Sequence, residues 1–447
     1  MANQTVRTLP PAGAVQDERE IEAVLEVLRS GDLSIGENVA RFEHEVAAVL
    51  GKELGVMVNS GSSALLLGIG LLDLAPGDEV ITSVLTFSTD VSAIVQLGLV
   101  PVFVDVAPDT FQIDVNRIAE MIGPRTKAIM APNLMGNCPD WDVIRAVADE
   151  HGLKVIEDSC DVLDTRLRGT RIGARSDISL TSFAISHSLT CAGNGGMVAM
   201  DDPELHDKCL TRRRWGRRSE SYLYGSRKGQ DTRWGPLEDG TMYDQIFIFD
   251  DLGYNFEPSE LGAAYGLVQL SRLGEFNARR RHAFDRYNDL LANHADKVIL
   301  PRTTPELETT WMRYGFILRP ESGYDRTEVQ NFLEDRNVQS RMVWTGNILR
   351  QPGFSGIEHR APGAGFPNAD LVMDHALCIP THHGLGSDDI GYVVETLSVL
   401  CGGCSRGPAS SLQAAVAADC LAPSKEMRWV GDTSRITRRG ESKNRVK

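Results

Sequence analysis

The stretch GDEVITSVLTFSTDVSAIVQLGLVPVFVDV, residues 77–106, indicates the fold of the large part of the chain. DEVITS and VPVFVDV are runs rich in β-branched residues, and the segment STDVSAIVQLG between them has the apolar spacing of a helix. VPVFVDV is apolar at almost every position, which is typical of a strand covered on both faces. The stretch therefore predicts a strand–helix–strand unit of a parallel sheet.

The same alternation extends over residues 52–200. The other expected strands are LGVMVN, AIMAP, LKVIED, DISLTSF and GGMVAM, and further helical segments are SSALLLGIGLLDL and WDVIRAVADEHG. With seven strand candidates, the pattern predicts an α/β domain with a mostly parallel sheet and helices on both faces. Ligands of such sheets bind at the carboxyl ends of the strands, so the loop residues there are the candidate site residues.

The remainder of the chain indicates a second, smaller unit. Residues 257–294 form one long helical pattern, and residues 298–400 mix strand patterns (WMRYGFILRP, SRMVWT) with helical ones (DRTEVQNFLEDRN, DDIGYVVETLSVL). The expected organisation is an N-terminal arm and helix (1–45), a large domain (46–285), a small C-terminal α+β domain (286–404) and a disordered tail (405–447) with a short helix at 411–420.

Composition narrows the functional class. The chain has 447 residues, 42% of them hydrophobic and 24% charged, and a net charge of −15. This acidity argues against a nucleic-acid partner. The start of the chain lacks the apolar core of a signal peptide, and no run reaches the roughly 18 apolar residues of a membrane span. We expect a cytoplasmic protein with no membrane partner.

The eight cysteines do not form a disulfide framework, because they are scattered through strand and helix patterns. Cys401 and Cys404 form one CGGC pair at the end of the last helical pattern. No second pair or histidine motif accompanies them, so two thiols at a helix terminus is the interpretation that we favour.

Two turns carry candidate site residues. NSGSSALLLG places Asn59 to Ser63 between a strand and a helix, where free N–H groups and hydroxyls form an anion site or simply cap the helix. VIEDSCDVL ends a strand with Glu157 and Asp158. A buried carboxylate there needs a partner, either a salt bridge, a helix cap or the nitrogen of a heterocyclic cation.

Phe87 and Ser182 follow two other strands, and each has an ordinary structural explanation. Phe87 could stack on a flat ring or simply pack in the core. In order along the chain, however, the phosphate turn, the aromatic, Glu-Asp and then SF with GGMV resemble the DegT family of sugar aminotransferases and dehydratases, which are fold-type-I PLP-dependent transferases. The resemblance runs from about residue 30 to residue 400 and includes LGYNFEPSELGAAYGLVQL.

This resemblance implies a cofactor, pyridoxal 5′-phosphate (PLP) or pyridoxamine 5′-phosphate (PMP), and a role for each matching residue. Gly61, Ser62 and Ser182 would hold the phosphate, and Phe87 would stack on the ring. Asp158 would face the pyridine nitrogen. Asn255 would reach the phosphate in the neighbouring subunit, which implies a homodimer with shared active sites.

The turn after Ser182 departs from the aminotransferases of this family. They carry there a lysine that binds the cofactor covalently, whereas this chain has His187, and no lysine lies between Lys154 and Lys208. Imidazole forms no Schiff base with pyridoxal under ordinary conditions, but it moves protons near neutral pH. By resemblance, histidine here marks 3-dehydratases of nucleotide-activated 4-keto-6-deoxyhexoses, such as CDP-4-keto-6-deoxyglucose 3-dehydratase.

The chain also resembles these dehydratases in WGRRSES and RMVWTGNILRQPGF, but it lacks one of their features. They bind a two-iron two-sulfur cluster through four cysteines. Cys160 matches the first of them, whereas Ser219 and Ser221 stand where a Cys-x-Cys pair would be. One thiolate cannot hold such a cluster. We therefore expect no cluster and no metal site.

The predicted function is PMP- or PLP-dependent 3-dehydration of a 4-keto sugar in deoxysugar or antibiotic biosynthesis, with His187 as the catalytic base and a reductase as a possible partner. One alternative is an aminotransferase-like enzyme that adds an amine to a keto sugar. The other is a catalytically silent family member that serves as a partner subunit. The sequence leaves open which sugar and which carrier, nucleotide or nucleobase, is used.

Overall fold

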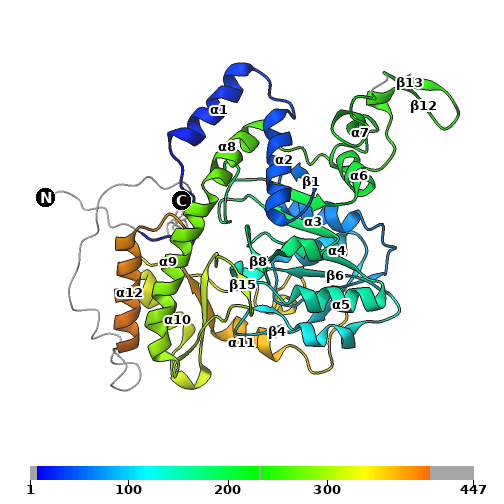
Figure 1. Cartoon of the computed structure of the whole chain (residues 1–447). Helices are drawn as coiled ribbons and strands as arrows, with labels where there is room; N and C mark the ends of the chain where they lie inside the picture. Colours follow the sequence, from blue (N-terminus) through cyan, green and yellow to red (C-terminus); the bar gives the residue numbers. More distant parts are fainter. Residues whose placement is uncertain (1–7, 231–232, 403–447) are drawn as a thin grey trace, which may run out of the picture.

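A seven-stranded sheet forms the centre of the molecule (Figure 1). The structure is a computed structural model that describes residues 8–230 and 233–402. The strands of the sheet are β1 (Leu54–Val58), β2 (Glu79–Ser83), β3 (Val100–Val104), β6 (Thr126–Pro132), β7 (Lys154–Asp158), β10 (Ile178–Ser182) and β11 (Gly196–Met200). Their order is β1-β11-β10-β7-β6-β2-β3. Each overlaps a strand expected from the sequence, so the prediction of an α/β fold with a seven-stranded sheet is confirmed.

The sheet is parallel except at β11, which runs antiparallel to both β1 and β10. Gly196, at the start of β11, pairs with Val58 and with Ser182, the last residues of its two neighbours. Asp158 at the end of β7 pairs with Pro132 at the end of β6. The loops after β1, β6, β7 and β10 therefore lie together at one edge of the sheet.

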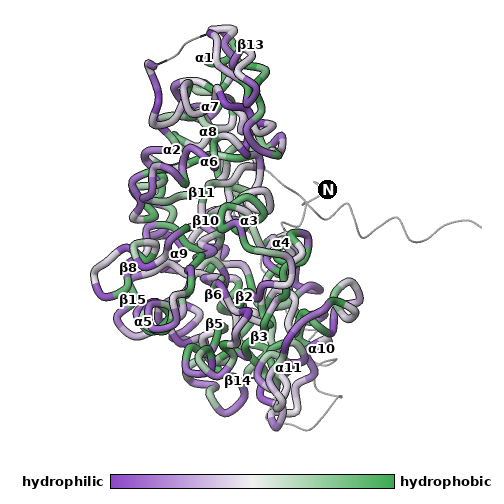
Figure 2. Tube along the Cα trace, turned by 90° about the vertical axis from the view of Figure 1, so that its right-hand side faces the viewer, coloured by the Kyte–Doolittle hydropathy of each residue, from purple (hydrophilic) through white to green (hydrophobic). Residues whose placement is uncertain are grey.

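Alternate residues of the strands pack against different helical layers, which explains why the strands are apolar on both sides. Val80 and Ile156 pack with one layer, whereas Ile81 and Val155 pack with the other. The first layer contains α3 (Gly61–Gly70), α4 (Ser88–Gln96) and α6 (Pro203–Arg213), and the second contains α5 (Trp141–His151). Figure 2 shows hydrophobic residues concentrated along α3 and the strands in the middle of the molecule.

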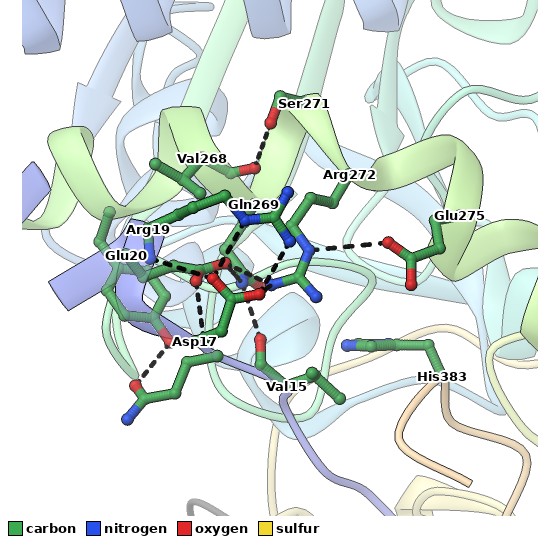
Figure 3. Close-up of polar contacts among 12 residues, drawn as sticks. Val15, Asp17, Arg19, Glu20, Val268, Gln269, Ser271, Arg272, Glu275 and His383 are labelled. Atoms are coloured by element: carbon green, nitrogen blue, oxygen red, sulfur yellow. Dashed lines mark hydrogen bonds and ion pairs between the residues drawn. The ribbon is translucent and has the colours of Figure 1, made fainter. Parts of the chain in front are cut away.

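The sequence predicted one long helical segment over residues 257–294, but the structure has two helices there. The segment is divided at Arg272 into α8 (Glu260–Ser271) and α9 (Leu273–Leu291). Figure 3 shows the N-terminal segment converging on this break, where Arg272 Nη1 lies 2.8 Å from Glu20 Oε1 and 3.4 Å from Asp17 Oδ2. Asp17 and Glu20 also form the capping box of α1 (Glu18–Ser30), so these ion pairs join the N-terminal arm to the break.

A second, three-stranded antiparallel sheet follows α9, as expected for an α+β unit. Its core includes Leu9 of the N-terminal arm together with residues of α9 and of the later helices. The elements are β14 (Val298–Ile299), β16 (Tyr314–Leu318), β17 (Ala376–Ile379), α10 (Arg326–Glu334), α11 (Pro367–His375) and α12 (Ser387–Gly402). The expected strand at 340–345 is wrong, because that segment makes a single bridge, from Arg341 to Cys378.

The helix α2 (Glu37–Leu50) packs its buried apolar face with β1, β11 and α8. The remaining elements are smaller. They are the pairs β4 (Val106–Ala107) with β5 (Gln112–Ile113) and β12 (Trp234–Pro236) with β13 (Met242–Asp244), the sheet β15 (Leu307–Glu308), β8 (Arg166–Leu167) and β9 (Thr170–Arg171), and α7 (Ser219–Leu223). Figures 1 and 2 show α7 and β13 at one end of the molecule. They belong to a segment that we call the arm (residues 214–230 and 233–256), which is distinct from the N-terminal arm.

No helix among the described residues is long and apolar enough to span a membrane. The expected tail (405–447) and its helix at 411–420 lie outside the described residues, and so does Cys404. The domain boundaries remain predictions.

Candidate functional site

A cavity opens at the edge of the sheet where the strand ends meet. Most of the residues predicted for the site line it: Gly61, Ser62, Phe87, Asp158, Ser182 and His187. Asn255 does not line this cavity. It lies at the base of the arm and forms a backbone bridge with Arg214. The fold thus brings six predicted site residues, which span positions 61 to 187 of the sequence, together at one cavity.

The start of α3 forms one wall of the cavity. Ser60 caps the helix by accepting a hydrogen bond from the Ser63 N–H at 3.1 Å, which leaves the N–H groups of Gly61 and Ser62 without an intrahelical partner. A Cβ atom at Gly61 would lie 2.5 Å from the Cβ of Ser182, so only glycine lets the helix approach β10 this closely. Two free N–H groups and nearby hydroxyls form a cradle for a phosphate.

The two carboxylates at the end of β7 have different environments. Glu157 accepts a hydrogen bond from Asn133 at 3.0 Å and another from Ser159, and burial raises its pKa to about 7. Asp158 lines the cavity, accepts the backbone N–H of Cys160 at 2.9 Å, and also has its pKa raised by burial. Within the described ranges no lysine or arginine forms an ion pair with Asp158, so the salt bridge considered from the sequence is not formed.

Phe87 precedes α4 and is 46% exposed, so it does not pack in the core. Its ring meets that of Trp344 edge-on, with centroids 5.6 Å apart. Trp344 also lines the cavity and was not singled out from the sequence. The exposed face of Phe87 is available for stacking on a planar ligand.

His187 lies on the turn between β10 and β11, whose backbone is fixed by a hydrogen bond from its own N–H to the Ala184 carbonyl at 3.0 Å. Its imidazole Nδ1 is 3.5 Å from Asp161 Oδ1, and both side chains are largely buried. Asp161 in turn accepts the Met135 N–H at 2.9 Å. The contact meets the distance of an ion pair, and Nδ1 makes no hydrogen bond within the described residues. A carboxylate at this position favours a proton on Nδ1 over one on Nε2.

Arg280 of α9 donates hydrogen bonds to the turn that bears His187. Its guanidinium donates to the His187 carbonyl at 3.0 Å and to the Ser188 hydroxyl at 3.2 Å, and lies 3.1 Å from His383 Nδ1. Burial, together with Arg313, lowers the pKa of Arg280 to about 10, so it stays charged at neutral pH. Burial and Arg280 hold the pKa of His383 well below its usual range, and His383 is therefore neutral.

Several cavity residues were missed from the sequence. They are Asp90, Asn133, Asp161 and Trp344. Asp161 lies within the quoted segment VIEDSCDVL, three residues after Asp158, but nothing in the spacing indicates that it faces a histidine 26 positions later. Asp90 follows Phe87 in the first turn of α4, where an acidic residue is ordinary.

Cys160 also lines the cavity, whereas Ser219 and Ser221 are buried in α7 of the arm. In the part of the chain that the structure describes, no group of three or more His, Cys, Asp or Glu side chains is arranged to hold a metal ion. Cys401 is buried near the end of α12. The absence of an iron–sulfur cluster therefore stays a prediction from the cysteine count.

Comparison with solved structures defines the class. An Escherichia coli GDP-4-keto-6-deoxy-D-mannose 3-dehydratase with bound hydrated PLP superimposes with a TM-score of 0.78, at 27% identity over 88% of this chain and 99% of that one. The fold is that of the fold-type-I PLP-dependent enzymes, as the sequence predicted.

Within that class, the chain belongs to the DegT/DnrJ/EryC1/StrS aminotransferase family, whose model matches residues 14–398. A dTDP-4-dehydro-2,6-dideoxy-D-glucose 3-dehydratase of Saccharopolyspora spinosa is 35% identical over 399 residues, which is 87% of this chain and 85% of the relative. A GDP-4-keto-6-deoxy-D-mannose 3-dehydratase of Yersinia pseudotuberculosis is 29% identical over 382 residues, 83% of this chain and 94% of the relative.

Proposed function

We propose that this protein is a PMP/PLP-dependent 3-dehydratase of a 4-keto hexose, nucleotide-activated, in deoxysugar biosynthesis. The observation that carries the proposal is the composition of the cavity. His187 occupies the turn where the family's aminotransferases have lysine, and no lysine of the described chain lines the cavity. The similarity to 3-dehydratases acting on dTDP- and GDP-linked keto sugars supports the same reaction and a nucleotide carrier.

The residues of the cavity fit a pyridoxamine phosphate. The cradle at Gly61 and Ser62 suits its phosphate, and the exposed ring of Phe87 suits its planar ring. The carboxylate of Asp158 forms no ion pair with a lysine or arginine of the described chain and suits a protonated ring nitrogen. When bound, the group supplies an electron sink through its pyridine ring. Because nothing in the cavity can bind it covalently through a lysine, these contacts alone hold it.

In this proposal His187 moves the proton. Its imidazole accepts a proton from the 4′ carbon of the cofactor and can return one to the hydroxyl that leaves C3 of the sugar, so that the hydroxyl departs as water. Asp161 keeps the Nδ1 proton in place and stabilises the cationic ring that forms. Arg280 holds the turn in position by donating hydrogen bonds to the His187 carbonyl and the Ser188 hydroxyl.

We further propose a homodimer with shared active sites. The arm exposes several large apolar side chains, an arrangement that monomeric proteins rarely leave uncovered. They are Trp234, Met242, Tyr243, Phe247 and Leu252. Asn255 lies at the base of this arm, outside the cavity of its own chain, which is consistent with a role in the cavity of a partner. A cytoplasmic location and a reductase partner belong to the proposal as well.

The test is incubation of the purified protein with PMP and a panel of nucleotide-linked 4-keto-6-deoxyhexoses, followed by mass spectrometry. A product that has lost water and no longer appears with His187→Asn supports the proposal. An amino sugar as the sole product would favour the aminotransferase-like alternative. Absence of any spectral change in the bound cofactor with every sugar would favour a silent partner subunit.

A further inference from the structure

Asp90 is a second carboxyl group at the cavity, and the proposed chemistry leaves it without a role. It lies in the first turn of α4, its side chain is fully buried, and it lines the cavity. The Thr86 hydroxyl donates to one of its oxygens, whereas the other oxygen is buried and has no hydrogen-bond partner among the described residues. Asp158, itself a buried carboxyl group, lines the same cavity and is, after burial, the largest cause of the raised pKa of Asp90.

Two buried carboxyl groups that face the same cavity repel each other when both are charged, which favours a proton on one of them. The groups that face the pair decide which one. Asp158 accepts the backbone N–H of Cys160 at 2.9 Å, and a hydrogen bond with the Cys160 side chain also favours its charged form. Asp90 faces the negative charges of Asp158 and Asp161, and burial together with Asp158 holds its pKa well above the usual range. The proton therefore belongs to Asp90.

We propose that Asp90 is a positioning residue whose protonated carboxyl donates a hydrogen bond to Asp158, so that Asp158 alone is charged and is presented to the ring nitrogen of the cofactor. The proposal rests on the proposed function only in taking the ligand to be PMP. In a buried site, an internal hydrogen-bond donor favours the ionised form of a carboxylate before its ligand arrives.

The proton can be detected in the cofactor-free protein. The infrared difference between wild type and Asp90→Asn at neutral pH should contain the carbonyl band of one protonated carboxyl. The matched control is Asp105→Asn, at a buried aspartate that accepts two backbone N–H groups at the start of α11, and its difference spectrum should lack this band. A carboxylate loss in Asp90→Asn would overturn the proposal.

The pH dependence of the free energy of unfolding tests independently whether Asp90 is protonated. A carboxyl with a raised pKa binds more protons folded than unfolded, so stability falls as pH rises from about 4 through the raised value. In that window the unfolding equilibrium constant of wild type, relative to Asp90→Asn, should rise by up to about tenfold per pH unit. Equal pH dependence in the two proteins would contradict the assignment.

Cofactor binding tests the link to Asp158. Asp90→Asn keeps an N–H donor toward Asp158 and should bind PMP within about threefold of wild type. Asp90→Ala removes the donor and should weaken binding by about tenfold or more, with a loss that grows as pH falls because Asp158 then retains a proton. Equal affinity in both variants would show that Asp90 does not act through Asp158. None of these measurements needs the sugar, so failure of the dehydratase assignment is seen separately.

Discussion

The imidazole Nδ1 of His187 lies 3.5 Å from the Oδ1 of Asp161, on a segment that follows a different strand of the sheet. The carboxylate is held from its other side by the Met135 N–H at 2.9 Å. Histidine and carboxylate are thus fixed relative to each other by two loops at the same sheet edge. This arrangement is suited to a base that must keep one ring nitrogen protonated and the other free.

Asp161→Asn should bind PMP with near wild-type affinity and lose turnover by about 10- to 1,000-fold, because the amide neither selects the tautomer nor stabilises the imidazolium. Dehydration rate and PMP affinity measured on the same preparation separate the two effects. Asp164→Asn is the control, since Asp164 is an exposed neighbour with φ of 57°, a conformation that asparagine tolerates. A parallel fall in affinity and rate would instead indicate a collapsed site.

The sheet was predictable from the sequence because each βαβ unit is specified locally. Val80 and Ile81 illustrate this, since neighbouring residues must both be apolar when each faces a different helical layer. The turn bearing His187 could be placed for the same reason. It follows β10 directly, so its position at the sheet edge depends only on where that strand ends.

Features that depend on distant segments were missed. The break at Arg272 is stabilised by Asp17 and Glu20, some 250 residues earlier, and no local pattern signals it. Residues 340–345 have strand composition but meet β17 through one bridge only. Asp90, on the helix α4 that follows β2, lines the same cavity as Asp158 at the end of β7, and nothing local to either segment signals this. Asn255 differs from these cases, since its predicted role requires a second chain.

Glu157→Gln should change the pH dependence of the free energy of unfolding and leave the cavity lining unchanged, because Glu157 does not line the cavity. Burial raises the pKa of Glu157 to about 7, so the folded protein binds more protons than the unfolded chain between about pH 4 and pH 7. Wild-type stability therefore falls as pH rises through this window, and the variant, which can still accept from Asn133 and Ser159, should lack that part of the slope. Denaturant unfolding at several pH values measures it, with the exposed Glu53→Gln as control.

The cofactor should be held without a covalent bond. After PLP loading, borohydride reduction and proteolysis, mass spectrometry should find no pyridoxyl group on any lysine of the wild-type chain. His187→Lys should gain such an adduct at position 187, because it places a primary amine on the turn that lines the cavity. A stoichiometric adduct on a wild-type lysine would mean that a lysine outside the described cavity lining reaches the cofactor.

The purified protein should contain no iron–sulfur cluster. Cys160 is the single match to the four expected ligands, and a cluster of this type requires all of them. Anaerobic reconstitution with iron and sulfide, followed by desalting and metal analysis, should leave far less than one equivalent of iron, in wild type and in Cys160→Ser alike. Near-stoichiometric iron in wild type that disappears in Cys160→Ser would show that other cysteines complete the site.

His187→Asn is the variant on which the dehydratase proposal depends most directly. Asparagine is similar in size and can keep the backbone hydrogen bond to Ala184 and the Arg280 contact with the carbonyl of residue 187, so the turn should be preserved. It cannot accept a proton, and loss of a general base costs about 10²- to 10⁴-fold in rate. We expect unchanged PMP affinity and unfolding midpoint with a dehydration rate lower by that factor. Ser186→Ala, a change on the same turn and lining the same cavity, is the control for a packing effect. If His187→Asn removes water from the sugar at a rate close to that of wild type, another group is the base and the role assigned to His187 is wrong.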